Sequence, residues 1–441
     1  MTVASLCNDI LVLAVFLLVG FFVRELCKPL QKLFLPSSLI GGLILLLLGQ
    51  QILGVVEVPE SFGSIPSVMI DIVMAATVFG VTINRKKLGS YLDYSCMTMT
   101  SYGMQLGLGV LLGWLLQKIW PGLPDGWGVM GVFSFHGGHG TAAAAGAAFE
   151  KLGIEGNMAV GMVLSTLGLI VAMLVGMIMV NFGIRRGWGT YVKEPKKQPD
   201  YFYGGVLPEE KRVASGHTVT TGISINHLAL QVAWLLTALF IGRKLFGFLG
   251  AYIPFFNELP SVLHGIFGGA ILWQFLKATK LERYVDLKTI KLASGFCLEI
   301  TVFTAMATLD MEFVSTYIVP VLIYTVILAV LTVPIIFYLA YRFCREEWFE
   351  KACMAFGAAT GNTSTGLALV RAVDPDSLSS AGDTHGVYSA IMSWKDVFVG
   401  LTPIWLTSGT GLTCGVGFAM MFGFAAFGFI FFARKNKRTA A

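Results

Sequence analysis

Apolar runs of about 20 residues recur along this chain, and they limit its fold more than any other feature. A helix of that length spans the hydrocarbon core of a bilayer. Hydrophobic residues make up 55% of the sequence and charged residues 13%, whereas a soluble domain has about 25% charged residues. The runs lack the charged outer face that a large soluble helical protein requires. The sequence therefore predicts an all-α polytopic membrane protein.

We predict five membrane helices in each half of the chain and one more at its end. In the first half they cover about 8–23, 37–54, 65–83, 96–117 and 157–183. In the second half they cover about 226–248, 260–277, 290–309, 315–341 and 386–408. A further run at about 411–433 has no counterpart in the first half, and we expect it to be an extra C-terminal transmembrane helix.

Two stretches, at about 129–149 and 352–372, are apolar but are interrupted by Gly, Ala and hydroxyl residues. Their centres read Phe-His-Gly-Gly-His-Gly-Thr-Ala from Phe135 and Ala-Thr-Gly-Asn-Thr-Ser-Thr-Gly from Ala359. Lipid cannot hydrogen-bond unwound backbone, so such segments must be buried in protein or line a wet cavity. We interpret both as re-entrant hairpins or broken helices. Such a pair at corresponding places in two halves is typical of a transporter binding site.

Basic residues mark alternate loops and so predict the orientation. They gather at 24–32, 85–87, 185–212, 277–291, 342–351 and 434–438. The opposite loops carry acidic residues, at Glu57, Glu60, Asp125, Glu258, Asp310 and Glu312. This asymmetry predicts an external N-terminus, a cytoplasmic C-terminus and a multi-pass protein of the inner or plasma membrane. Because the basic residues lie in loops, the net charge of +5 does not indicate a nucleic-acid partner.

The two halves share landmarks and are predicted to have opposite orientations. Leu35-Pro36-Ser37-Ser38 opens one Gly-containing run, and Leu259-Pro260-Ser261-Val262 opens its counterpart. Each half then places its broken stretch before its fifth helix. This arrangement is typical of inverted-topology repeats, whose broken segments can meet near the bilayer midplane. The predicted units are a first repeat at 1–185, a cytoplasmic linker at 186–225, a second repeat at 226–408 and an accessory segment at 409–441.

The two breaks have a chemistry suited to an anion and a hard cation. A helix that restarts after Gly140 or Gly361 presents unpaired N–H groups, which can hold a carboxylate. The nearby hydroxyls can join backbone carbonyls as oxygen ligands for sodium, and they belong to Thr141, Thr363, Ser364 and Thr365. Small residues also permit close helix packing in membranes. We assign that simpler role to 142–148 and the site role to the two polar stretches.

Four ionisable residues fall at membrane depth, where such groups usually face a cavity or one another. Glu299 lies in the eighth predicted helix, and Arg371 follows the second break. Lys395 and Asp396 are neighbours in the tenth helix. Adjacent residues on a helix do not share a face, so we expect these two to have different partners. Lys395 either pairs internally, for example with Glu299, or joins Arg371 as a candidate partner of an anionic substrate.

These features resemble the glutamate:sodium symporter family, the bacterial GltS-type carriers. The stretch from Gly137 to Ala142 is similar to the family's GGHGT motif. The stretch at 356–372 is similar to its second re-entrant motif, usually GATPTAIANM, with Ser364 in place of Pro and Leu369 in place of Asn. Asp396 coincides with an Asp that the family keeps in its last span. The resemblance covers about 1–408.

The resemblance implies a sodium-coupled secondary transporter of two inverted five-helix repeats, forming a homodimer, in which a mobile core carries the hairpins past a fixed scaffold. We assign the substrate site to Gly138, His139, Gly140, Thr141, Thr363, Ser364, Thr365 and Arg371. We assign the ion ligands to Asn362, Asp396, Glu299, Ser165 and Thr166. Sodium is the only metal ion expected, as the coupling ion, and no organic cofactor is expected.

The sequence thus predicts elevator-like, alternating-access symport of sodium with glutamate or a related small organic anion. Ser364, Leu369, Glu299 and Lys395 leave open a proton-coupled or sodium-independent carrier of another organic anion. A receptor, a channel or an intramembrane enzyme is a further alternative. An enzyme requires an activated nucleophile or a metal set, and the sequence has no Ser-His-Asp or H-E-x-x-H grouping. A channel offers no reason for two hairpins of unlike sequence.

Overall fold

The computed structural model describes residues 3–33, 35–80, 91–192, 208–253, 256, 261–374 and 378–433, apart from 213, 215 and 222. Within these ranges all regular secondary structure is helical, as predicted. Seven of the described helices are long and apolar enough to cross a membrane. The chain is therefore an all-helical, multi-pass membrane protein.

The helices of the first half are α1 (Val3–Leu26), α2 (Lys28–Lys32), α3 (Ser37–Leu48), α4 (Ile65–Thr77), α5 (Leu92–Ile119), α6 (Met130–Lys151) and α7 (Asn157–Arg185). Those of the second half are α9 (His227–Tyr252), α11 (Ser261–Ala278), α12 (Leu287–Ala307), α13 (Met311–Phe343), α14 (Trp348–Thr360), α15 (Thr363–Val373), α16 (Ala381–Ile391) and α17 (Val397–Thr407). The chain then continues through α18 (Gly411–Gly428) into a π-helical turn, Phe429–Ala433.

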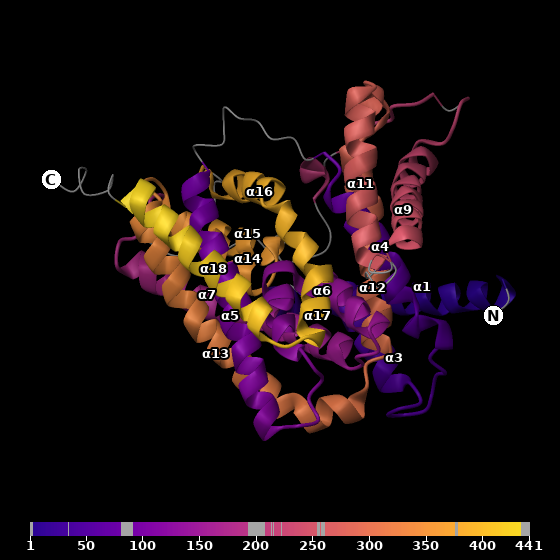
Figure 1. The fold of residues 1–441 in the computed structure, drawn as a ribbon, viewed down its shortest axis with the longest axis horizontal. Helices are drawn as coiled ribbons and strands as arrows, with labels where there is room; N and C mark the ends of the chain where they lie inside the picture. The colour runs from indigo at the N-terminus through magenta and orange to yellow at the C-terminus, as the bar shows by residue number, and fades with distance from the viewer. Residues whose placement is uncertain are drawn as a thin grey trace.

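The helices pack as two bundles, each built from both halves of the chain (Figure 1). The first bundle contains α1, α3, α4, α9, α11 and α12, on the side where the N-terminus lies. The second bundle contains α5, α6, α7 and α13 to α18. The bundles touch mainly where α4 and α12 of the first pack against α6 and α7 of the second. Both predicted broken stretches therefore belong to the second bundle.

Corresponding helices of the two halves begin or end at one constant spacing along the chain. The helix starts Val3 and His227, Ser37 and Ser261, and Asn157 and Ala381 are separated equally, as are the helix ends Ile119 and Phe343. The landmark Leu259-Pro260 lies outside the described residues, as do the basic residues at 85–87 and 434–438 and the part of the predicted linker at 193–207.

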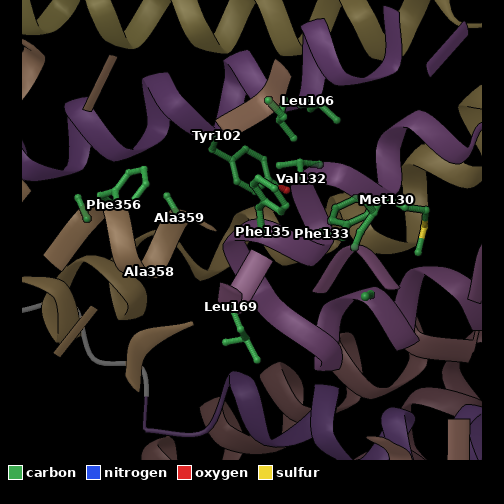
Figure 2. Close-up of a cluster of buried hydrophobic side chains, with 14 of the residues drawn as sticks. Tyr102, Leu106, Met130, Val132, Phe133, Phe135, Leu169, Phe356, Ala358 and Ala359 are labelled. Atoms are coloured by element: carbon green, nitrogen blue, oxygen red, sulfur yellow. The ribbon is translucent and has the colours of Figure 1, made fainter. Parts of the chain in front are cut away.

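The core of the second bundle surrounds the two broken stretches (Figure 2). Tyr102 of α5 lies close to Phe133 and Phe135 of α6, while Phe356 and Ala359 of α14 approach from the side (Figure 2). All five side chains are almost completely buried. The breaks are thus enclosed by tightly packed apolar groups rather than by lipid.

Some predicted spans differ from the observed helices. α3 ends at Leu48, short of the predicted residue 54, and Gly49 caps it. The span predicted at 386–408 is not one helix, because the 3₁₀ turn Ser393–Asp396 separates α16 from α17. This turn places two charged residues outside a regular α-helix, which the hydropathy of the surrounding run does not reveal.

The extra helix α18 lies along α5 with almost no space between the two backbones. A Cβ atom added to Gly103 would lie 2.4 Å from the backbone nitrogen of Met421. A Cβ atom added to Gly417 would lie 2.3 Å from the backbone nitrogen of Gly107. Glycine seams of this kind let membrane helices approach closely. The prediction of a C-terminal apolar helix at 411–433 is confirmed.

Candidate functional site

The first broken stretch interrupts α6 at Gly138. This residue has φ 64° and ψ −156°, a conformation that side chains with a Cβ atom scarcely adopt. The helix resumes immediately afterwards with His139, Gly140 and Thr141. Glycine is therefore required at 138 for a backbone reason, independently of any ligand.

The second broken stretch separates α14 from α15 at Gly361 and Asn362. The Asn362 side chain accepts a hydrogen bond from the backbone N–H of Thr365 at 2.9 Å. In return, the Asn362 backbone N–H donates to the Thr365 hydroxyl at 2.9 Å. This reciprocal pair is a capping box, and it fixes where α15 starts. Asn362 and Thr365 thus have a structural role at the break.

A threonine closes each break in the same way. The Thr141 hydroxyl donates to the carbonyl of Phe133 at 2.5 Å, eight residues earlier. The Thr365 hydroxyl donates to the carbonyl of Gly357 at 2.8 Å, also eight residues earlier. Each bond runs from the restarted helix to a carbonyl on the far side of the interruption, and at the second break it adds to the bond that the Gly357 carbonyl accepts from the Gly361 N–H at 3.0 Å.

The two breaks touch. A Cβ atom added to Gly138 would lie 3.2 Å from the carbonyl oxygen of Gly361 and 3.7 Å from Cβ of Asn362. Next to them, a Cβ atom added to Gly168 of α7 would lie only 2.3 Å from the carbonyl oxygen of Thr360. Two segments from opposite halves of the chain therefore bring their unwound backbone to one point inside the second bundle.

Helix α7 supplies two further predicted ion ligands beside the first break. His139 is 6% exposed, and its Nε2 lies 3.2 Å from the Thr166 hydroxyl. That hydroxyl in turn donates to the carbonyl of Met162 at 3.0 Å. Ser165 is fully buried, and its hydroxyl has no hydrogen-bond partner among the described residues. A buried hydroxyl of this kind is available as an oxygen ligand.

Lys395 and Asp396 pair with each other, which corrects the prediction that they have different partners. Nζ of Lys395 lies 3.0 Å from Oδ1 of Asp396. The prediction assumed α-helical geometry, in which adjacent side chains diverge. Both residues instead lie in a 3₁₀ turn, and the long, flexible Lys395 side chain folds back to reach the carboxylate of its neighbour. Lys395 also lies 5.8 Å from the centre of the Tyr102 ring.

Two histidines border this charged pair, and neither was assigned to the site from the sequence. His136, two residues before Gly138, packs edge-on against Tyr102 with ring centres 5.3 Å apart. His385 of α16 contacts the Tyr94 hydroxyl through Nδ1 at 2.9 Å and the Thr363 hydroxyl through Nε2 at 3.4 Å. His385 lies just before a predicted span, and no spacing in the sequence links it to either break.

Two predicted residues lie away from the junction. Arg371 is exposed in the last turn of α15, whereas the break is at the opposite end of that helix. Glu299 is exposed on α12 of the first bundle. Its neighbour Leu298 lies 3.1 Å from a Cβ atom added to Gly140, so α12 does approach the restarted α6. The side chain of Ser364 lies outside the described residues.

A cavity of about 690 Å³ separates the two bundles. The first bundle and its loops contribute Gly63, Pro66, Ala305, Thr308, Leu309 and Asp310 to its wall. The second bundle and its loops contribute Gly122, Pro124, Glu150, Glu155, Gly156, Met158 and Ala159. The cavity therefore lies between the two bundles.

Glu347, in the turn before α14, forms hydrogen bonds with two other segments of the chain. It accepts hydrogen bonds from the Tyr191 hydroxyl and from Ser380, whose N–H lies 2.8 Å and hydroxyl 2.6 Å away. Burial alone would raise the pKa of Glu347, but the hydrogen bonds from Ser380 and Tyr191 outweigh it and hold the pKa below its ordinary value. The hydrogen bond to Glu347 raises the pKa of Tyr191 to about 12.

The family model described as sodium/glutamate symporter matches residues 3–374. The chain belongs to the sodium/glutamate symporter family. This family member is thus a membrane transporter, and the resemblance found in the sequence is confirmed. A search of curated proteins gives no match. The matched residues include both breaks and end before α16, so His385, Lys395 and Asp396 lie beyond them.

Proposed function

We propose that this protein is a sodium-coupled secondary active transporter that carries glutamate or a related small organic anion by alternating access. The observation that carries the proposal is the contact between Gly138 and Gly361, which joins the two unwound segments. Unwound backbone inside a membrane protein supplies N–H groups for an anion and carbonyls for a cation. No enzyme chemistry is required of this site.

The anion would bind at the restarted helices. The N-termini that follow Gly138 and Asn362 carry partial positive charge and favour a carboxylate. His139, Gly140, Thr141, Thr363 and Ser364 belong to these first turns, in line with their prediction as substrate ligands. Thr365 contributes through the capping box, and Arg371 remains a predicted substrate ligand although it lies at the opposite end of α15 from the break.

Sodium would bind among oxygens next to the anion. Ser165 offers a buried hydroxyl without a partner in the described structure, and Thr166 lies beside His139. Asn362 and Asp396 offer an amide and a carboxylate oxygen. Oxygen ligands suit a hard cation, and they could couple its binding to that of the anion.

We further infer that the two halves are inverted repeats with an external N-terminus and a cytoplasmic C-terminus. The common spacing between matching helix ends supports this inference, as does the shared threonine closure of the breaks. The second bundle would act as the mobile core and the first as the scaffold, with the cavity between them opening and closing. The homodimer and the domain limits implied by the resemblance remain predictions.

Uptake into proteoliposomes tests the function. We expect labelled glutamate to accumulate when an inward sodium gradient is imposed, and to exchange in saturable counterflow as a carrier requires. Replacing sodium with choline at two pH values separates sodium coupling from proton coupling. Uptake that responds to neither the sodium nor the proton gradient would reject coupled transport, and non-saturable flux would indicate a channel.

A second candidate is a carrier driven by protons or by no cation. The Lys395–Asp396 pair favours it, because an ammonium already neutralises the carboxylate that was predicted to bind sodium. Glu299, exposed on α12 next to the inter-bundle contact, would then be the titrating group. Acceleration of uptake by an inward proton gradient, without sodium, would favour this candidate.

A further inference from the structure

The ion pair between Lys395 and Asp396 is only partly buried. Lys395 and Asp396 remain 16% and 17% exposed, so the surrounding side chains do not cover them completely. We propose that Lys395 binds the carboxylate of the transported anion, and that Asp396 is its counter-ion while the carrier is empty. This assignment rests on the proposed function and concerns residues beyond the segment that matches the family.

Lys395 is connected to the first break through aromatic contacts. Its ammonium lies over the ring of Tyr102 at 5.8 Å, and that ring packs against His136 at 5.3 Å. A cation held at a ring face keeps its orientation while staying free to exchange its anion. His136 lies two residues before Gly138, so these contacts lead from the ammonium to the first break.

Lys395 is also close to the second break. His385 lies within electrostatic range of Lys395 and contacts Thr363, the first residue of α15. Thr363 is exposed, and it follows the Asn362 cap directly. Lys395 is therefore linked to the second break through His385, whereas Arg371 lies at the far end of α15.

His136 carries the independent sign of a missing ligand. Its Nε2 atom is buried and has no hydrogen-bond partner among the described residues. Buried polar atoms nearly always have a partner, so an orphaned imidazole nitrogen indicates an absent group. A carboxylate held by Lys395 would supply an acceptor for this nitrogen in its protonated tautomer.

Exchange of partners at Lys395 would couple the anion to a cation. When the substrate carboxylate takes the ammonium, Asp396 loses its counter-ion in a low-dielectric site. An unpaired carboxylate there is costly, and a sodium ion beside Asp396 removes that cost. Each ligand then favours the binding of the other, which is the reciprocal linkage that symport requires. In the empty carrier the pair is neutral, so the return step moves no net charge at this site.

Binding to the purified full-length carrier tests this exchange. L-Glutamate is titrated with sodium and with choline, and affinity is read from thermal shift. We expect sodium to raise the affinity of the unmodified protein about tenfold or more. Asp396→Asn should bind glutamate with an affinity that no longer depends on sodium. Lys395→Met should weaken glutamate binding about tenfold or more and should still respond to sodium alone.

Two further variants serve as controls, one for misfolding and one for the general effect of removing a positive charge. The double variant Lys395→Met/Asp396→Asn removes both charges and leaves none unpaired, so it should fold, bind glutamate about tenfold or more weakly, and show no sodium dependence. Lys118→Met is the matched control, because Lys118 also lies over an aromatic ring, that of Trp114 at 3.7 Å, but away from the breaks. Its affinity and sodium dependence should equal those of the unmodified protein.

The outcomes separate this proposal from the proposed function. Unchanged glutamate affinity in the double variant, or full sodium dependence in Asp396→Asn, would overturn the role of Lys395 and leave symport intact. If the unmodified protein binds neither glutamate nor succinate, with or without sodium, the proposed function itself is rejected.

Discussion

Thr141 and Thr365 occupy matching positions in the two halves, and each places its hydroxyl on the backbone carbonyl eight residues earlier, closing one of the two helix breaks. In an intact helix each carbonyl accepts a hydrogen bond from the N–H four residues later, so a bond that spans eight residues is unusual. The same closure in both halves means that the two breaks have a common backbone design. Only their flanking residues differ, with Gly138 at one break and Asn362 at the other.

We expect Thr141→Val and Thr365→Val each to reduce uptake roughly tenfold or more, since each removes a bond that holds a break open in one geometry. Loss of one buried hydroxyl hydrogen bond should also destabilise each variant by about 0.5–1.5 kcal/mol. Uptake per amount of protein and the thermal midpoint measure the two effects.

Thr325→Val is the control for this pair. The Thr325 hydroxyl donates to the carbonyl of Val321 inside an unbroken stretch of α13, where that carbonyl also has its helical partner. Uptake by this variant should be near normal. Equal losses in all three variants would mean that the closures at the breaks have no special importance.

Gly138→Ala should impair the carrier, because alanine at φ 64° and ψ −156° is strained by about 1–3 kcal/mol. Its methyl group would also lie 3.2 Å from the carbonyl oxygen of Gly361 and push the breaks apart. We expect a lower thermal midpoint and a raised KM for the transported anion.

Gly247→Ala is the matched change in α9, where a Cβ atom would meet nothing within 4 Å. Alanine there should stabilise the helix slightly. If Gly138→Ala transported as well as Gly247→Ala, the backbone conformation assigned to the first break would be wrong.

The contacts of Glu347 predict a pH dependence of stability. The pKa of Glu347 lies below its ordinary value of 4.5, so its ionised form stabilises the folded state above that pH, and the contribution is lost as the pH falls through the folded pKa. Glu347→Gln should therefore lower the thermal midpoint near neutral pH. The difference from the unmodified protein should shrink below pH 4.5.

Glu346→Gln removes an equal charge from the neighbouring exposed residue and serves as the control. Its thermal midpoint should follow that of the unmodified protein at every pH. A Glu347→Gln curve that stays parallel to the unmodified curve down to low pH would contradict the ionic origin of the effect.

The seam between α5 and α18 gives a fourth prediction. Gly417→Ala would place a methyl group 2.3 Å from the backbone nitrogen of Gly107, so the two helices must separate. We expect a clear fall in the thermal midpoint, because the added methyl group breaks the close packing of α5 against α18. Gly415→Ala meets nothing within 4 Å and should be neutral. A normal midpoint for Gly417→Ala would show that the helices tolerate separation.

The sequence predicts the parts of this protein that follow from local chemistry. Hydropathy predicts the helical membrane fold, and the glycines and hydroxyls predict where α6 and the second hairpin break. The sequence predicts less well the side-chain contacts that depend on how the helices pack. The 3₁₀ turn that pairs Lys395 with Asp396 is invisible to hydropathy. His385 reaches Thr363 only because α16 folds back beside α15.

The glycine seam on α5 also limits what the last helix can do. With backbones in such close contact, α18 cannot stay behind as a stationary anchor in the lipid while α5 shifts. If the second bundle moves as proposed, it must carry α18 and the turn after it through the bilayer, with the exposed phenylalanines Phe422, Phe427 and Phe431 displacing acyl chains. The speed of the carrier should therefore respond to the viscosity and thickness of the surrounding membrane.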